Sequence, residues 1–413
     1  MTEDIFIVGA GMTAFGKMLD RSVKSLVAEA VNSAMADAGA TMADIDLALF
    51  SNTTQALMEG QHAVAGQVAL RAMGFAGLPI INVENACASA STAVYQAVGM
   101  LRAGMSEVAL AVGVEKMHDV DKHKSSAIFD GAWDVHEADK VLAGLADIGA
   151  GVFPPEGTPP SVRAPFMQLY ASMARGHMRE FGTTQRQLAA VSAKNHHHST
   201  MNNLSQFRKD FSVDEVLAGP VIAWPLTLPM CSPISDGAAA AILCTRSALS
   251  RFPDAAPVRL LSSVLTSGSD RAWGEFDRHL CRVAALRAFD EAGVGPSDMS
   301  VAEVHDASAF AEIVQIENLG LCEIGQGGWM SERGETSLGG RIPVNPSGGL
   351  ESKGHPIGAT GLGQLFELVQ QLRGRAGPRQ VQGARFAVAE NGGGFHGVEE
   401  AAAVVTVLAR EDA

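Results

Sequence analysis

Cys87 is surrounded by the features that suit a cysteine nucleophile. It lies between an apolar run at 78–83, which predicts a buried strand, and an alanine-rich run at 88–101, which predicts a buried helix. At a helix N-terminus, unpaired backbone N–H groups and the helix dipole stabilise a thiolate and lower the thiol pKa. The small residues around Cys87 leave space for a substrate. The alternative interpretation is a structural cysteine packed as a small hydrophobe.

His355 occupies a second glycine-rich turn, Gly-His-Pro-Ile-Gly-Ala-Thr-Gly at 354–361, which leads into a predicted helix at 359–374. An internal repeat makes this helix the partner of the helix after Cys87. We therefore expect the two helix N-termini to face one another and bring Cys87 and His355 together. A Cys–His pair supplies a nucleophile and a proton relay for acyl transfer.

Two further groups are suited to stabilising negative charge on a substrate oxygen. Gly392, Gly393 and Gly394 offer backbone N–H groups without side chains, which suits an oxyanion hole. His305 ends a predicted strand at 298–305 and is suited to donate to a substrate carbonyl. Each histidine alone is more often structural than catalytic, but the set lies on loops related by the repeat, which favours catalysis.

The elements that position these residues follow one layer order twice. The helices at 22–39 and 282–293 both end in Ala-Gly, and the strands at 44–51 and 298–305 follow them. Each copy is too thin to cover both faces of its own sheet. We therefore predict an α/β fold, a five-layered α/β/α/β/α sandwich of two pseudo-repeated halves. The halves are expected at 1–250 and 251–413.

An insertion from Met117 to about Pro220 interrupts the repeat, and its length predicts a loop domain that covers the substrate. Its cations are candidates for binding an anionic cofactor, although solvated helix faces explain most such charges. The candidates are Arg175, Arg179 and Lys194. The tract His196–His198 is interpreted as a surface helix end, since consecutive helical residues diverge by about 100° and do not converge on a metal.

Composition narrows the class of protein. The 413 residues include 31 basic and 45 acidic ones, for a net charge of −14, which argues against a general nucleic-acid binder. The five cysteines are scattered and odd in number, so we expect neither a disulfide scaffold nor a metal site, and a reducing, cytoplasmic setting. No dinucleotide fingerprint, signal peptide or membrane span is apparent, so we expect no redox cofactor and no membrane association.

The motifs resemble those of the thiolase superfamily along nearly the whole chain. They are Asn-Ala-Cys-Ala-Ser at 85–89, Ser-Asp-Gly-Ala-Ala-Ala at 235–240, the run at 354–361 and the glycines at 392–394. A His-Asp pair at 305–306 resembles the sterol carrier protein-type, lipid-transfer-like branch.

The resemblance implies that Cys87 is acylated by an acyl-CoA after activation by His355. It also implies that His305 and His355 hold the thioester oxygen, and that the N–H groups of Cys87 and Gly392 hold the acyl-enzyme oxyanion. Coenzyme A, as a substrate, is implied to bind at the loop domain.

Two positions depart from the family pattern. Thiolases use a second cysteine as acid/base, but Glu390 stands at one of its positions and Ala307 at the other. Cys231 is a third position, in a loop that is commonly structural in the family. Our hypothesis is that Glu390, with a pKa raised by desolvation, transfers the proton at the substrate α-carbon. The alternative is that Glu390 is a structural hydrogen-bond acceptor.

The resemblance favours a thiolase-type acyltransferase that cleaves or forms a 3-oxoacyl-CoA. A carbon acyltransferase with a non-CoA acceptor, a retro-aldolase acting on a bulky CoA thioester and a non-catalytic lipid carrier are the alternatives. The resemblance also implies a homodimer or higher oligomer, and a small zinc-ribbon/OB-fold partner protein.

Overall fold

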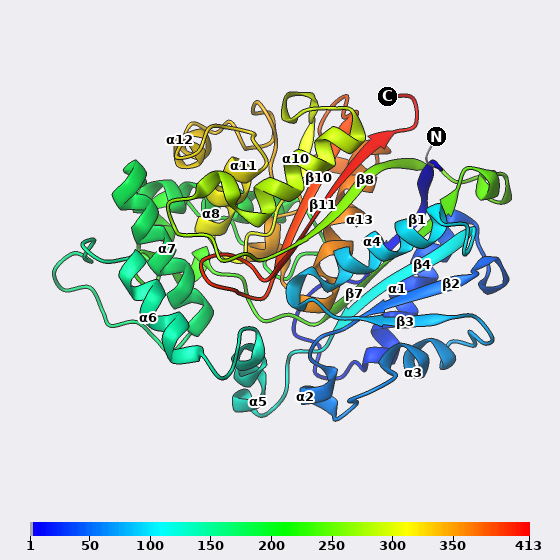
Figure 1. The fold of residues 1–413 in the computed structure, drawn as a ribbon, viewed down its shortest axis with the longest axis horizontal. Coiled ribbons are helices and arrows are strands. Elements are labelled where there is room, and N and C mark those ends of the chain that lie inside the picture. Colours follow the sequence, from blue (N-terminus) through cyan, green and yellow to red (C-terminus); the bar gives the residue numbers. More distant parts are fainter. Residues whose placement is uncertain (1–2) are drawn as a thin grey trace.

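The computed structural model describes residues 3–413, with every side chain in that range except that of Leu142. Its strands form a nine-stranded sheet in the order β3-β2-β4-β7-β1-β8-β11-β10-β9, and β5 and β6 form a separate pair (Figure 1). The strands are β1 (Ile5–Met12), β2 (Leu47–Ser51), β3 (Ile80–Val83), β4 (Val108–Glu115), β5 (Val221–Ala223), β6 (Leu226–Thr227), β7 (Gly237–Thr245), β8 (Val258–Ser267), β9 (Val301–Glu303), β10 (Phe386–Gly393) and β11 (Ala402–Arg410).

The strand pairings show the internal repeat. In the N-terminal half, β2 and β4 are parallel, and β4, β7 and β1 follow as antiparallel neighbours. In the C-terminal half, β9 and β10 are parallel, and β10, β11 and β8 follow as antiparallel neighbours. The two halves meet where β1 pairs with β8 through residues 5–7. The boundary expected at residue 250 stays a prediction.

Helices cover the sheet in layers. The principal helices are α1 (Val23–Ala38), α2 (Gln55–Glu59), α3 (Ala65–Arg71), α4 (Ser89–Arg102), α10 (Leu280–Ala292), α11 (Ala309–Asn318), α12 (Gly327–Glu332) and α13 (Thr360–Leu372). Helices α4 and α13 pack between the inner faces of the two halves, α1 and α3 cover the outer face of the first, and α10 and α11 that of the second.

Alternation along β1 shows how one strand serves two layers. Ile5 and Ile7 belong to the inner core with α4 and α13, whereas Phe6 and Val8 belong to the outer core with α1. Successive side chains of a strand point to opposite faces, so a strand covered on both sides is apolar throughout. The predicted five-layered sandwich is thereby confirmed.

The insertion forms a helical lobe at one end of the sandwich, on the left in Figure 1. Its helices are α5 (Lys122–Ala127), α6 (Ala138–Ile148), α7 (Pro165–Phe181), α8 (Gln185–Thr200) and α9 (Val213–Leu217). Helices α6 to α9 pack in one core with α11, whereas α5 lies against α2. No helix in residues 3–413 is long and apolar enough to cross a membrane.

The histidine tract is not the surface helix end that we expected. Helix α8 continues through it to Thr200, and His196 and His198 are buried while His197 is exposed. His196 Nε2 contacts the carbonyl oxygen of Pro229, and His198 Nδ1 contacts that of Asn345. These two rings therefore join α8 to loops of the main fold.

Candidate active site

Cys87 lies on a sharp turn between β3 and α4. The turn contains a short 3₁₀ segment, Ala86–Ala88, and Ala86 adopts a positive φ of 47°, a conformation that non-glycine residues rarely take. Gly393 of β10 packs directly on this turn, because a Cβ there would lie 2.5 Å from the backbone nitrogen of Ala88. The nucleophile loop is thus held in a strained shape against the C-terminal half.

His355 faces the sulfur of Cys87, with 3.3 Å between Nε2 and Sγ. The other ring nitrogen, Nδ1, is 2.7 Å from Thr360 Oγ1, and the Thr360 hydroxyl donates to the carbonyl oxygen of Pro356 at 3.0 Å. Since that hydroxyl hydrogen is already used, Nδ1 must be the donor to Thr360. Nε2 is therefore the free acceptor, oriented to take the thiol proton.

Close packing of the two helix N-termini brings the loops together. A Cβ on Gly361 of α13 would lie 1.9 Å from Ser91 Oγ of α4, so only glycine fits. Ser51 donates to the carbonyl oxygen of Gly358 at 2.6 Å, and Glu115 accepts from the Gly358 N–H at 2.9 Å. These contacts fix the His355 loop against the N-terminal half, as the repeat predicted.

The protonation states differ from our expectation for Cys87. Helix α4 begins two residues after the cysteine, and burial raises the pKa of the thiol to about 12, although N–H groups of Gly394 and Cys87 favour the thiolate. Burial, and then the neighbouring His305, hold the pKa of His355 well below its ordinary value. At neutral pH the pair is a thiol beside a neutral imidazole, so the thiolate forms during reaction by proton transfer.

His305 is the second imidazole of the site. Its ring centroid is 5.2 Å from that of His355, and burial lowers its pKa to about 4, so it is neutral. Both of its ring nitrogens are buried, and neither has a hydrogen-bond partner in residues 3–413. A buried polar group without a partner is unfavourable, and a substrate oxygen would satisfy the donor nitrogen of this ring.

These three side chains line a cavity of about 210 Å³, which we call the reaction chamber. Its remaining wall is largely apolar and comes from both halves and from the loop domain. The other lining residues are Thr53, Ala86, Ile128, Phe129, Ala132, Ala164, Pro165, Phe166, Met167, Tyr170, Ser232, Pro233, Ile234, Ala307, Ile357 and Gly394. A nucleophile, a base and a donor thus meet in one apolar chamber.

Comparison with known families decides the identity of this arrangement. Residues 5–215 match the family model described as thiolase, N-terminal domain, and residues 269–410 match the one described as thiolase C-terminal domain-like. The chain belongs to the thiolase family.

Relatives place this thiolase-family chain in the branch that its motifs indicated. It is 37% identical over 402 residues to an acetyl-CoA acetyltransferase of Methanothermobacter thermautotrophicus, with 96% of this chain and 97% of that protein covered. It is also 37% identical over 399 residues to sterol carrier protein 2 of Bos taurus, with 94% of this chain and 69% of that protein covered. The predicted sterol carrier-type resemblance is confirmed.

Solved structures share the fold. An Ltp2-ChsH2(DUF35) aldolase has a TM-score of 0.75 at 22% identity, with 99% of both chains covered. Human mitochondrial 3-ketoacyl-CoA thiolase in complex with CoA has a TM-score of 0.70 at 16% identity, with 98% of both chains covered. At these identities the likeness concerns the thiolase fold alone.

The glycine amide that stabilises the Cys87 sulfur in this thiolase-family site belongs to Gly394, two residues after the Gly392 that the resemblance implied. Gly394, with a φ of 65°, lines the reaction chamber, and its N–H acts on the Cys87 sulfur. Gly392 and Gly393 remain in β10, paired with Ala403 and Ala402. Gly393 supports the nucleophile turn by contact, and the amides of Gly394 and Cys87 favour the thiolate. Gly394 ends the triplet that the sequence identified.

Glu390 lies behind the chamber wall. Its Oε2 accepts from the backbone N–H of His305 at 3.0 Å, and its Oε1 accepts from the thiol of Cys281 at 3.3 Å. Burial and then repulsion from Glu400 raise its pKa to about 8. The raised pKa agrees with our hypothesis for Glu390, but its contacts are those of an acceptor that holds the His305 loop.

Sequence reasoning passed over Cys281 and Tyr170. Cys281 is on α10, buried beside Glu390, and no motif surrounds it. Tyr170 is on α7, and the packing of the loop domain brings it to the reaction chamber. No motif surrounds Tyr170 either. Cys231 stays outside the chamber wall and donates to the carbonyl oxygen of Thr227.

The three cations considered for cofactor binding are engaged by protein groups. Lys194 is buried, 2.6 Å from Glu312 Oε1, and Arg175 donates to the carbonyl oxygen of Trp224 at 2.9 Å. Arg179 donates to the carbonyl oxygen of Ile148 at 2.9 Å. None of the three lines the reaction chamber. Their contacts attach α7 and α8 to their surroundings.

Proposed function

We propose that the protein is an acyltransferase that cleaves or forms a 3-oxoacyl-CoA through an acyl-enzyme on Cys87, with coenzyme A as acceptor. The observation that supports this most directly is the 3.3 Å contact between Cys87 Sγ and His355 Nε2 inside the reaction chamber. A thiol and an adjacent base of this geometry form the activated nucleophile of acyl transfer. The acetyl-CoA acetyltransferase relative agrees with it.

One base is sufficient for both half-reactions. The Cys87 thiol gives its proton to His355 Nε2 as the sulfur attacks the 3-oxo carbon, and His305 stabilises the oxyanion. The bond between C2 and C3 breaks, and the leaving acetyl-CoA carbanion takes the proton from His355. In the second half, His355 takes the proton of the CoA thiol, CoA attacks the acyl-enzyme, and the Cys87 thiolate regains a proton from His355.

Glu390 has, in this scheme, a positioning role. Its carboxyl holds the backbone of His305, whose ring contributes to the chamber. We expect Glu390→Gln to keep Cys87 acylation and to lower thiolytic turnover less than about tenfold, because the amide oxygen still accepts from His305. Intact-protein mass spectrometry measures the acylation of Cys87, and the rate of acetoacetyl-CoA thiolysis measures the turnover. A hundredfold loss confined to thiolysis would instead assign Glu390 the proton transfer at the α-carbon.

Arg163 is placed to attract the phosphates of CoA. It is exposed, has no ion pair in residues 3–413, and precedes Ala164, which lines the reaction chamber. We expect Arg163→Ala to raise KM for CoA about threefold with kcat unchanged, the scale of an exposed ion pair. Lys194→Met is the contrasting variant, in a buried and paired cation. It leaves Glu312 buried without its ion-pair partner, so it should strongly lower the melting temperature. An unchanged KM in Arg163→Ala would refute the assignment.

Assembly is the next part of the proposal. Strand β3 is an edge of the nine-stranded sheet and precedes the nucleophile turn, and an unpaired edge strand is a template for another chain. We expect a homodimer, so light scattering should give twice the chain mass of 43.1 kDa. A stable monomer would contradict this.

We retain a zinc-ribbon/OB-fold partner as a proposal, since one solved neighbour of the same fold is an Ltp2-ChsH2(DUF35) aldolase. Full activity of the chain alone would contradict this proposal.

The alternative functions make different use of Cys87. Neither position 307 nor position 390 supplies the second thiol of a thiolase, and one solved neighbour of the same fold is an aldolase. A retro-aldolase needs no acyl-enzyme, whereas a carbon acyltransferase forms one and transfers it to a carbon acceptor. A lipid carrier forms none and turns nothing over. Detection of the acyl-enzyme therefore separates the acyltransferases from the other two.

A further inference from the structure

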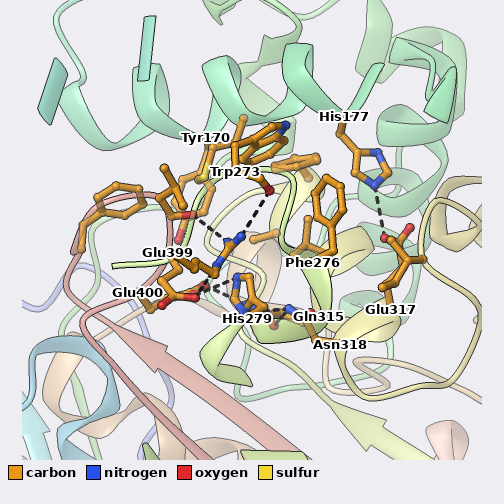
Figure 2. A pocket seen from close by; sticks show the side chains of 18 residues that line it. Tyr170, His177, Trp273, Phe276, His279, Gln315, Glu317, Asn318, Glu399 and Glu400 are labelled. Atoms are coloured by element: carbon orange, nitrogen blue, oxygen red, sulfur yellow. Dashed lines mark hydrogen bonds and ion pairs between the residues drawn. The ribbon is translucent and has the colours of Figure 1, made fainter. Parts of the chain in front are cut away.

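A second chamber lies behind Tyr170. Tyr170 lines both this chamber and the reaction chamber, and it is buried, with 7% of its surface exposed. Aromatic side chains, including Trp273 and Phe276, form one side of the second chamber (Figure 2). Polar side chains form the opposite side in that view: His279, Gln315, Asn318 and Glu400.

The size of the second chamber suits the end of a chain. Its volume is about 40 Å³, and one water molecule needs about 10–15 Å³ of such space. It therefore accommodates about three non-hydrogen atoms. An acyl chain that starts at Cys87 and passes Tyr170 would place only its terminal group there.

His279 supplies the second chamber with an N–H donor that lacks an acceptor in residues 3–413. Trp273 Nε1 also has no hydrogen-bond partner there, but protein atoms cover it, so it does not face the chamber. His279 Nδ1 accepts from the backbone N–H of Cys281 and contacts Asn318 Nδ2, each at 3.2 Å, so the ring hydrogen is on Nε2. Glu400 Oε2 lies 3.6 Å from Nε2, which is beyond hydrogen-bond range. An oxygen atom of a ligand in the chamber would satisfy the donor of His279.

The charges of the second chamber favour a neutral oxygen over an anion. The cation Arg271 is already paired with Glu399 at 2.6 Å, and both are buried. Glu400 adds a further carboxyl group, and Glu317 is 3.2 Å from His177 Nε2. A carboxylate brought here would meet these acids without a free cation. A hydroxyl or ketone oxygen would accept from His279 Nε2, and a hydroxyl would also donate to Glu400.

Tyr170 has the properties of a movable partition. No hydrogen bond from its hydroxyl group to a protein group is present in residues 3–413, so packing alone holds its ring in place. We propose that the second chamber is the distal end of the acyl-binding site and that Tyr170 controls access to it. The chamber selects acyl groups that end in a neutral hydroxyl or ketone. This inference rests on the proposed acyl-CoA function and adds the substrate class.

Binding to Cys87→Ala tests the inference without chemistry. Isothermal titration calorimetry would compare CoA thioesters from butanoyl to dodecanoyl, each with a methyl, hydroxyl or carboxylate terminus. At the length that reaches the second chamber, we expect the hydroxyl form to bind about tenfold more tightly than the methyl form, and the carboxylate form to bind most weakly. His279→Phe removes the Nε2 donor, keeps a ring at this position and should reduce the hydroxyl preference.

Access is tested by Tyr170→Ala in the same background. Removing the ring should improve binding of the longer chains about tenfold relative to butanoyl-CoA, because the two chambers merge. Tyr95→Ala is the control, since Tyr95 is the other tyrosine of the chain and lies on the surface of α4. The inference would be overturned if methyl, hydroxyl and carboxylate thioesters bound equally at every chain length. It would also be overturned if both variants kept the wild-type selectivity for terminus and length. Neither outcome would contradict acyl transfer. No binding of any thioester would contradict both proposals.

Discussion

Replacing Cys87 with alanine should abolish the covalent intermediate. The wild-type protein, incubated with acetyl-CoA or another acyl-CoA, is expected to gain the mass of one acyl group in intact-protein mass spectrometry. Cys87→Ala should gain none, and thiolytic turnover should fall by about 10³-fold or more, the order seen when a nucleophile is removed from a catalytic unit. The reason is that Cys87 Sγ is the sulfur in contact with the base His355 in the reaction chamber.

Cys231→Ala is the matched control for this experiment. Cys231 is also half-buried and lies one residue before Ser232 of the chamber wall, but its thiol donates to the carbonyl oxygen of Thr227. This variant should acylate like the wild type. An adduct that persists in Cys87→Ala would reject Cys87 as the nucleophile. No adduct on the wild type, with a zinc-ribbon partner also present, would favour the retro-aldolase and give Cys87 a structural role.

His355→Ala should change both the rate of acylation and its dependence on pH. In the wild type the pKa of His355 is held well below its ordinary value and that of Cys87 is raised to about 12, so the neutral thiol–imidazole pair persists across neutral pH. The acylation rate should be nearly flat from about pH 6 to 9 because the base is always available. Without the imidazole only the thiolate reacts, and its fraction grows about tenfold per pH unit below the thiol pKa.

The acylation rate of His355→Ala should therefore be lower by about 10²- to 10⁴-fold at pH 7, the usual contribution of a general base, and should rise steadily with pH. Acylation followed by quenched-flow mass spectrometry at several pH values measures both effects. His197→Ala is a suitable control, because His197 is an exposed histidine paired with Asp210. A flat pH profile in His355→Ala would show that another group deprotonates Cys87.

The sequence was sufficient to predict the fold and the meeting of Cys87 with His355. Both follow from the repeat: two apolar strands, each followed by a glycine-rich or small-residue turn and a helix, have to pack symmetrically. The repeat also placed His305 at the end of a strand beside them. These inferences depend on local patterns that are present twice, which is why the chain alone supported them.

Other properties of the site depend on burial by distant segments, and sequence patterns do not report them. The thiol pKa of Cys87 is raised and not lowered, because desolvation outweighs the helix N-terminus. Lys194 was a candidate for binding an anionic cofactor and His198 was interpreted as part of a surface helix end, but the C-terminal half covers both through Glu312 and Asn345. Tyr170 reaches the chamber only because the loop domain folds back over it. Each property that the sequence did not predict depends on a contact between segments far apart in the chain.

The division of the nucleophile and its base between the two halves also bears on folding. Cys87 and His355 are 268 positions apart, so their contact is among those of large sequence separation that form slowly. A chain with only one half ordered would carry the cysteine without its base, so no imidazole would take the thiol proton during the reaction. During synthesis the N-terminal half emerges first. Full reactivity of Cys87 therefore appears only when the last strands, β10 and β11, have joined the sheet, so it reports that the whole chain has folded.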